Sequence, residues 1–471
     1  MKYHIITLGC PKNVVDSEGM DSLLAAQGHT AVPALDMADV VIVNTCSFIA
    51  TARNETLATL HAIGQRKLRG QRLIAAGCMA ESHADLVRSV PGIDALLSTR
   101  EWMRIADLVA GHDRPSYTPA IPMLNVHAVE TSGSIAATAW GIASDRTTAG
   151  DADWRTAPIR RTAQGPTAYL KISDGCNLRC AFCTIPSFKG DMRSKAIAAV
   201  LGEARSLAAQ GVREIVLVAQ HLTDYGRDLG LHDGLATLLD ELCAVLPTTV
   251  WLRLMYVYPH GITPRLIETM ARHPQICAYL DLPLQHAHPA TLRRMRRPSD
   301  VDHIRDVIGA LRAAMPDIAL RSTFIVGFPG ETRSEFQALL DFIAEIQFDR
   351  IGAFRYSREP GTPAADAPSH VRPHVIERRW HECMQVQQPI ALIRNQRWEG
   401  RILDVLIEGQ GTSTDGRVLL VGRSFRDAPE VDGQIFVWGT APVGARVPVW
   451  IRHATPYDLW GELTDEVNDK R

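Results

Sequence analysis

The sequence predicts an α/β protein of three domains within its 471 residues. Strand-like apolar runs alternate with amphipathic helix-like segments in residues 1–112 and again in residues 162–391, which is the pattern of parallel sheets with helical crossovers. From about residue 394 the helical period disappears, and short apolar runs separated by glycine-rich turns replace it. We therefore expect a doubly wound parallel domain, a partial (β/α) barrel of six units and a small β-barrel.

The N-terminal segment, residues 1–112, places one cysteine after each of three expected strands. The strands are expected at Tyr3–Leu8, Val40–Asn44 and Arg72–Ala76, and the helices at Asp16–Ala26, Asn54–Arg69 and Glu81–Val90. Because parallel strands end at one edge of the sheet, we expect the thiols of Cys10, Cys46 and Cys78 to meet there. Gly9 and Gly77, directly before two of them, would let the backbone turn closely around a bound group. Three unrelated buried cysteines are the alternative.

A second cysteine set follows the first strand of the predicted central barrel. The barrel strands are expected at Ala168–Ile172, Glu214–Ala219, Trp251–Met255, Ala278–Leu282, Leu320–Val326 and Arg350–Arg355, with helices between them such as Ser194–Gln210 and Asp302–Met315. The loop Cys176-Asn-Leu-Arg-Cys180-Ala-Phe-Cys183 comes soon after the first of these strands. It is therefore expected at the C-terminal mouth, where such barrels carry their chemistry.

Three thiolates on one loop can hold three irons of a four-iron, four-sulfur cluster. The fourth iron then has no protein ligand and is open to a small molecule, to which it can pass an electron. Structural zinc is the alternative, but it takes four closed ligands, and no fourth Cys or His follows within a short loop. The same reasoning predicts a second cluster at Cys10, Cys46 and Cys78, whose open iron suits a protein that inserts sulfur.

Composition limits the cellular compartment and the classes of binding partner that we expect for this protein. The net charge is −2 at pH 7, so no overall field favours nucleic acid. No apolar run approaches roughly 18 residues, and the N-terminus does not resemble a signal peptide, so we expect a cytoplasmic protein without a membrane partner. The cysteines outside the two sets, Cys243, Cys277 and Cys383, are expected to be small buried hydrophobes.

The C-terminal segment, residues 394–463, is expected to form a small barrel that resembles the oligonucleotide/oligosaccharide-binding fold. Its five strands are expected at Arg401–Ile407, Arg417–Val421, Gln434–Val437, Arg446–Arg452 and Leu459–Leu463. From residue 394 to the end there are ten Lys plus Arg and twelve Asp plus Glu, a balance that suits a basic protein partner better than RNA. Residues 113–161, rich in Ser, Thr, Ala, Gly and Pro, are expected to form a linker.

The loop from Cys176 to Cys183, with Phe182 before its last cysteine, resembles the motif of the radical S-adenosylmethionine superfamily. The resemblance implies that the open iron binds the amino and carboxylate groups of S-adenosylmethionine. It also implies adenine contacts at a position matched here by Ile325, Val326 and Gly327, although a buried strand followed by a helix-start turn explains these residues equally well. Candidates for further contacts are Gln220, for the methionine part, and Gln285 and Arg321, in the mouth.

The three parts together resemble the methylthiotransferases, which have an N-terminal cluster domain, a radical S-adenosylmethionine core and a C-terminal TRAM barrel. The segments that resemble the branch acting on a ribosomal protein are Leu8–Asn13 with Asp16–Glu18, Asp281–His286, Gly422–Glu430 and Tyr457–Glu462. The resemblance implies methylthiolation of an aspartate β-carbon in small-subunit ribosomal protein twelve, free or on the ribosome. It further implies two 4Fe-4S clusters, S-adenosylmethionine, a sulfur source and an electron donor such as flavodoxin or ferredoxin.

Two other functions stay open at this stage. One is a tRNA adenosine methylthiotransferase, and the other is a non-enzymatic iron–sulfur electron carrier, which would leave the six-unit barrel unexplained. No side chain stands out as a general acid or base. The basic run Arg293–Arg297 is typical of a solvated helix end, with recognition of an acidic element as the alternative.

Overall fold

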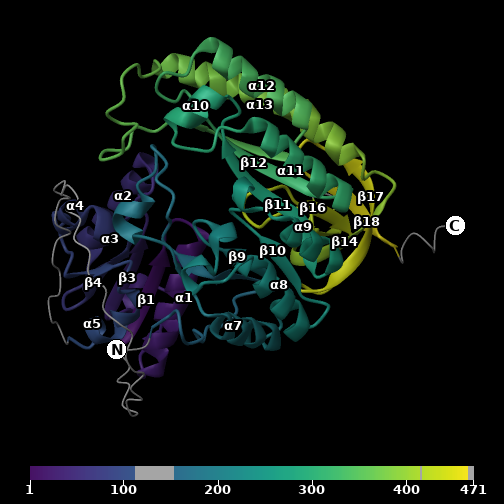
Figure 1. Cartoon of the computed structure of the whole chain (residues 1–471). Coiled ribbons are helices and arrows are strands. Elements are labelled where there is room, and N and C mark those ends of the chain that lie inside the picture. Colours follow the sequence, from purple (N-terminus) through teal and green to yellow (C-terminus); the bar gives the residue numbers. More distant parts are fainter. Residues whose placement is uncertain (112–152, 414–415, 465–471) are drawn as a thin grey trace, which may run out of the picture.

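The computed structural model describes residues 1–111, 153–413 and 416–464, and these form three domains (Figure 1). The N-terminal domain and the C-terminal barrel lie on opposite sides of the central domain in this view. The described residues contain no helix with the length and apolar character needed to cross a bilayer. Cys243, Cys277 and Cys383 are all buried, as expected.

The N-terminal domain is a five-stranded sheet in the order β2-β1-β3-β4-β5, and every pairing is parallel. Its strands are β1 Lys2–Thr7, β2 Thr30–Ala31, β3 Val40–Thr45, β4 Arg72–Gly77 and β5 Ala95–Ser98. Its helices are α1 Pro11–Ala26, α2 Ala50–Arg66, α3 Cys78–Ser82, α4 Ala84–Arg88 and α5 Ile105–Val109, with the 3₁₀ turns η1 Leu35–Met37 and η2 Trp102–Arg104. The apolar run of β3 is fully buried because helices cover both faces of the sheet.

Two helices of this domain differ from their predicted limits. Helix α1 begins at Pro11, earlier than expected, because a proline suits the first helical position, where no backbone donor is needed. The single helix expected over Glu81–Val90 is two short helices, since His83 between them leaves the helical conformation with φ −139°. The earlier starts of α1 and α3 bring Cys10 and Cys78 to helix starts.

The central domain is an open sheet of six parallel strands in the order β13-β12-β11-β10-β9-β6. Its strands are β6 Thr167–Lys171, β9 Glu214–Val218, β10 Trp251–Leu254, β11 Ile276–Gln285, β12 Ala319–Val326 and β13 Arg350–Arg355, and a separate antiparallel pair consists of β7 Ser173–Asp174 and β8 Arg193–Ser194. Since β6 and β13 stand at opposite edges, the barrel does not close, and the prediction of a partial barrel is confirmed.

Helices cover the outer face of this sheet. They are α7 Ile197–Ala209, α8 Gly234–Val245, α9 Pro264–Arg272, α10 Pro289–Arg294, α11 Val301–Ala314, α12 Arg333–Ile346 and α13 Pro373–Gln396, with short turns η3 Leu222–Asp224, η4 Arg227–Leu229 and η5 Pro259–Gly261. The short helix α6 Ile185–Lys189 packs against α3 of the N-terminal domain instead. Alternate strand residues such as Ile215 and Leu217 pack outward into the largest core of the protein.

The concave face of the central sheet is filled by both neighbouring domains. Val216 and Val218 point to this side and share one apolar cluster with Val15 of α1 and Leu406 of the C-terminal barrel. A half-open barrel leaves apolar surface that must be covered, and here other domains provide the cover. The three domains are therefore held in one arrangement by a common core.

The C-terminal domain is a closed barrel in the order β14-β15-β16-β18-β17, as expected for five strands. Its strands are β14 Ile402–Thr412, β15 Val418–Arg423, β16 Ile435–Trp438, β17 Arg446–Ala454 and β18 Leu459–Leu463. Alternating residues such as Val405, Ile407 and Val449 fill its interior. Closure leaves no unpaired strand edge.

Only the end of the predicted linker, 153–161, falls within the described residues. Here the chain is packed, in contrast to the expectation of an open linker. Trp154 and Ile159 are buried against the N-terminal core, and the Ile159 amide donates to Glu203 of α7 at 2.7 Å. The polar, low-complexity residues around Trp154 and Ile159 made the segment look like a linker, although these two side chains bury apolar area. Residues 112–152 lie outside the described part.

A buried ion cluster joins the central sheet to the C-terminal barrel. Arg253 of β10 donates to the Glu214 carboxylate at 2.6 Å, and Arg423 of β15 donates to the same carboxylate. The side chains of Glu214 and Arg253 are completely buried. Glu214 thus pairs with two guanidinium groups, and the partly exposed Glu408 adds a second carboxylate to Arg423.

We expect Glu214→Gln to destabilise the protein by about 3–5 kcal/mol, because it leaves the buried Arg253 guanidinium without its carboxylate and Arg423 with only the partly exposed Glu408. Urea unfolding of the full chain measures this change. Asp317→Asn is the matched control, since the Asp317–Arg401 ion pair joins the same two domains at 2.7 Å but is about half exposed. Its loss should cost at most about 1 kcal/mol. Equal costs for the two variants would contradict the expectation.

Candidate functional site

Three cysteines meet at the carboxyl edge of the N-terminal sheet, as the strand order predicts. Cys10 caps α1 after β1, Cys46 follows β3, and Cys78 opens α3 after β4. Strands β1, β3 and β4 are direct neighbours, so the three thiols lie in one cluster. Burial raises the pKa of Cys78 to about 12; nearby Lys189 opposes this rise, and Cys10 and Cys46 add to it. Such a set stabilises thiolates only around a cation.

Backbone glycines allow this close approach. Gly9 has φ +98°, and a Cβ there would stand 2.7 Å from Cys46 Cβ and 2.9 Å from its Sγ. Gly77 has φ +94°, and a Cβ there would stand 2.3 Å from Asn44 Oδ1. The expectation that these glycines let the chain turn tightly is confirmed, and side chains of the same site fill the space.

Asn13 connects the parts of the N-terminal cysteine site. Its side-chain amide donates to the carbonyls of Leu8 at 2.8 Å and Thr45 at 3.0 Å, and its Oδ1 lies 3.9 Å from Cys78 Sγ. The residue is 1% exposed. Asn13 therefore connects the ends of β1 and β3 with the third cysteine by buried hydrogen bonds.

The second set lies on the loop between β7 and α6 at the mouth of the central sheet. Cys176 and Cys180 are buried and Cys183 is half-buried. Burial raises the pKa of Cys183 to about 12, and the neighbouring thiols Cys180 and Cys176 raise it further. Backbone donors of Leu178 and Ile185 face Cys176 and Cys183.

Each triplet supplies the number of thiolates that a four-iron cluster with one open iron takes. Each thiolate of such a cluster binds a different iron, whereas structural zinc takes four ligands around one point.

A buried charge network lies between the two cysteine sets. Lys189 of α6 reaches Asp174 at 3.0 Å and Asp16 of α1 at 3.8 Å, and Lys171 reaches Asp174 at 3.7 Å and also bonds Asp16. All four side chains are at most 4% exposed. Burial opposes the charge on Lys189, but Asp174, Cys78 and Asp16 outweigh it and raise its pKa. Through Lys189 the network connects Asp174, two residues before Cys176, with Cys78 of the N-terminal set.

An apolar cluster stands beside the Cys176–Cys183 loop. Phe182 and Ile325, both predicted site residues, pack with Phe328 and Tyr356. The rings of Phe182 and Phe328 meet edge to face with centroids 6.5 Å apart. These residues line the kind of apolar surface that an adenine ring fits.

The other two residues predicted beside adenine have different surroundings. The Val326 side chain is buried in the outer core, on the opposite side of β12 from Ile325. Gly327 has φ +78°, and a Cβ there would stand 2.4 Å from Ile376 of α13. Its lack of a side chain therefore serves helix packing, and only the backbone of Val326 and Gly327 remains for a ligand.

The three polar candidates for ligand contacts also differ in their surroundings. Gln220 donates to Asp174 at 2.8 Å, while its buried Oε1 has no protein partner. Gln285 ends β11 with φ +74°. Arg321 donates to Asp281 at 2.8 Å and lies 3.5 Å from Asp432 of the C-terminal domain. The charge of Arg321 is thus balanced in the domain interface, whereas Gln220 bonds Asp174, two residues before Cys176, and keeps a free acceptor.

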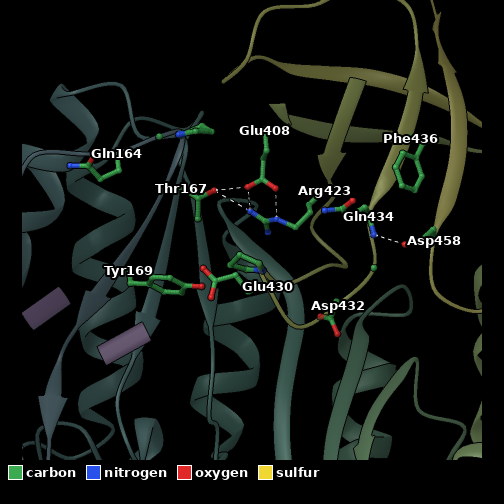
Figure 2. Close-up of a pocket in the computed structure, with 14 residues that line it drawn as sticks. Gln164, Thr167, Tyr169, Glu408, Arg423, Glu430, Asp432, Gln434, Phe436 and Asp458 are labelled. Atoms are coloured by element: carbon green, nitrogen blue, oxygen red, sulfur yellow. Dashed lines mark hydrogen bonds and ion pairs between the residues drawn. The ribbon is translucent and has the colours of Figure 1, made fainter. Parts of the chain in front are cut away.

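A pocket of about 630 Å³ lies away from the cysteines, between the start of β6 and the C-terminal barrel (Figure 2). Glu408 accepts from Arg423 at 2.8 Å and from Thr167 at 3.1 Å. Figure 2 shows the hydroxyl of Tyr169 directed toward Glu430. The lining carboxylates outnumber the single arginine, in agreement with the acidic balance of this segment.

Comparison with known proteins agrees with this geometry. Residues 170–343 match the radical SAM superfamily, residues 2–98 the uncharacterized protein family UPF0004 and residues 400–464 the TRAM domain. The chain is 66% identical over 468 residues to the ribosomal protein uS12 methylthiotransferase RimO of Roseiflexus castenholzii, covering 98% of this chain and 96% of that one. It is 40% identical to the protein of the same name from Geobacter sulfurreducens over 469 residues, 98% of each chain.

The chain belongs to the ribosomal protein uS12 methylthiotransferase RimO family. The predicted class of enzyme, a radical SAM methylthiotransferase, is thereby confirmed, and so are 4Fe-4S clusters and S-adenosylmethionine as its cofactors. Among solved structures, the radical S-adenosylmethionine methyltransferase TsrM from Kitasatospora setae has a similar fold, with a TM-score of 0.56 and 15% identity over 77% of this chain and 73% of that one.

Sequence reasoning missed two kinds of residue in this RimO family member. Lys189 and Asp174 gave no signal, because their partner Asp16 belongs to another domain. Arg297 was part of the basic run that we interpreted as a solvated helix end, yet its guanidinium lies 3.8 Å from Cys180 Sγ. The signal available in the sequence was the apolar Met295 within the run of arginines.

We expect Gly9→Ala to remove the iron bound by the N-terminal set, because the new Cβ would displace Cys46. Iron and sulfide per chain after anaerobic reconstitution should fall by about one four-iron cluster. Gly28→Ala is the control: Gly28 has φ +78° but no atom within 4 Å of its would-be Cβ. It should lose only about 1 kcal/mol of stability from backbone strain and keep its iron. Unchanged iron in Gly9→Ala would show that the site tolerates the displacement.

Proposed function

We propose that this enzyme methylthiolates the β-carbon of an aspartate in ribosomal protein uS12, giving 3-methylthioaspartate. The observation that supports this most strongly is the pair of cysteine triplets, Cys10/Cys46/Cys78 and Cys176/Cys180/Cys183, with a shared buried charge network between them. One triplet alone would suit S-adenosylmethionine cleavage, and the second adds a place for sulfur. The choice of uS12 as substrate rests on the name of the full-length relatives, ribosomal protein uS12 methylthiotransferase.

In this proposal each triplet holds one 4Fe-4S cluster. When bound, the cluster on the central loop supplies the electron that cleaves S-adenosylmethionine, and the cluster on the N-terminal domain supplies the sulfur. Radical chemistry is needed because the C–H bond at an aspartate β-carbon is not acidic enough for a general base. This agrees with the lack of an evident acid–base pair in the sequence.

The chain itself binds, orients and excludes water. Phe182 and Ile325 offer an apolar surface for adenine beside the central loop, and the backbone of Gly327 lies next to them. We assign the free Oε1 of Gln220 to accept from the amino group of the methionine part, and Gln285, at the end of β11, to a further polar contact. Buried Asp16 and Lys189 keep the two triplets at a constant separation, which proximity catalysis requires.

The C-terminal barrel is proposed to bind the substrate protein. Its acidic balance and the pocket with Glu408, Glu430 and Asp458 suit a basic partner such as a ribosomal protein. A ribosomal substrate, free or on the ribosome, places the enzyme in the cytoplasm. An electron donor such as flavodoxin or ferredoxin and a sulfur source complete the set of partners.

Mass spectrometry of an anaerobically reconstituted reaction tests the proposed function. The reaction contains the protein, S-adenosylmethionine, sulfide, a strong reductant and a peptide from the aspartate loop of uS12, with undermodified tRNA in a parallel tube. We expect a gain of one methylthio group on the peptide aspartate. A modified adenosine in the tRNA, with an unmodified peptide, would assign the enzyme to tRNA instead.

Mutation should distinguish the functions of the two triplets. Cys180→Ala should abolish 5′-deoxyadenosine formation, whereas Cys46→Ala should keep it but stop methylthio transfer, because only the Cys176/Cys180/Cys183 triplet is proposed to cleave S-adenosylmethionine. Liquid chromatography of 5′-deoxyadenosine and mass spectrometry of the peptide measure the two steps. Cys243→Ala removes a buried cysteine outside both sets and should change neither. Normal 5′-deoxyadenosine formation by Cys180→Ala would refute the assignment.

A further inference from the structure

Arg297 is held beside the central cysteine loop by three contacts. Its Nη1 lies 3.8 Å from Cys180 Sγ, and its Nη2 donates to the carbonyl of Pro283. The guanidinium plane lies over the Tyr258 ring, 4.4 Å from the centroid. A carbonyl, an aromatic face and a sulfur atom thus hold one cation in one orientation.

The loop itself is attached to the same segment. The amide of Ala181, next to Cys180, donates to the carbonyl of Met295 at 2.9 Å. Met295 is completely buried, and the amide of Arg297 donates to Leu292 at 2.8 Å, which closes the turn after α10. The position of Arg297 relative to Cys180 is therefore set by backbone bonds on both sides and not by a flexible surface side chain.

The charge of Arg297 is available to the sulfur. Within the described part of the chain, the polar contacts of its guanidinium are the Pro283 carbonyl and the Cys180 sulfur, and no carboxylate forms an ion pair with it. This differs from Lys189 near Cys78, whose charge is shared with Asp174 and Asp16. The two cysteine sets thus have different electrostatic surroundings.

Each thiol of the central loop has its own donor. Backbone amides of Leu178 and Ile185 face Cys176 and Cys183, as described above. Cys180 has the Arg297 cation instead. Hydrogen bonds to cluster sulfurs, and charge next to them, are among the factors that set the reduction potential of iron–sulfur clusters.

The geometry points to Arg297 as the residue that raises the reduction potential of the cluster at Cys176, Cys180 and Cys183, through its charged hydrogen bond to Cys180. This inference rests on the proposed function, which places a 4Fe-4S cluster there. One-electron reduction takes the cluster from the 2+ to the 1+ state with an electron from an external low-potential reductant, and no bond to Cys180 breaks. The added negative charge is stabilised by the guanidinium, so the reduced state is favoured. Arg297 acts through a ligand and is a positioning residue.

A redox titration of the full chain followed by electron paramagnetic resonance tests this role. The chain carries Cys46→Ala, so that only the central cluster contributes, and dithionite is the reductant. We expect Arg297→Gln to lower the midpoint potential, and Arg297→Lys to lower it by less, because a single ammonium keeps the charge but cannot hold Cys180 and Pro283 together. Arg293→Gln is the control, since it removes the same charge from an exposed position on α10.

The outcomes are distinguishable. A midpoint of Arg297→Gln equal to that of Arg293→Gln, at equal iron content, would overturn the role of Arg297 and leave the proposed function intact. If Arg297→Gln assembles no cluster, the midpoint potential of Arg297→Lys is compared with that of Arg293→Gln, and equal values would overturn the role of Arg297. A parent chain that assembles no four-iron cluster at all would overturn the proposed function, and this inference with it.

Discussion

Two lysines and two aspartates, buried between the N-terminal domain and the central sheet, determine where the two cysteine sets stand relative to each other. They are Asp16, Lys171, Asp174 and Lys189. Each ion is costly to bury alone, so the four are stable only as a set, and the set forms only when the domains are docked. Docking of the domains and construction of the site are therefore one event.

The concave face of the central sheet explains why docking is permanent. The sheet does not close, and its inner side chains pack against α1 on one side and the C-terminal barrel on the other. The Glu214–Arg253–Arg423 cluster adds buried charge to the second contact. As a result the C-terminal barrel, the central cysteine loop and the N-terminal cysteine set keep constant positions, which suits the proposed reaction, since it must join three groups.

The two cysteine sets are built alike but are surrounded differently. Each set brings three thiols together, the first at the carboxyl ends of three parallel strands and the second on one loop between β7 and α6. Near Cys78 the cation Lys189 is balanced by carboxylates, whereas near Cys180 the cation Arg297 stacks on Tyr258 without one. A difference of this kind suits two clusters with different tasks, one that delivers sulfur and one that delivers an electron.

The sequence by itself determined the three domains, the parallel order around Cys10, Cys46 and Cys78, and the position of the Cys176–Cys183 loop, because these follow from local periodicity and from the rule that parallel strands end at one edge. It also indicated Phe182 and Ile325, which the structure places in one cluster. It could not show that Gly327 makes room for Ile376, that Arg321 is balanced by Asp432, or that Trp154 ends the linker in a core. Only the tertiary structure decided these points and the positions of Lys189 and Arg297 beside the cysteines, since each depends on a partner far away in the chain. The pattern around a residue carries no information about such a partner.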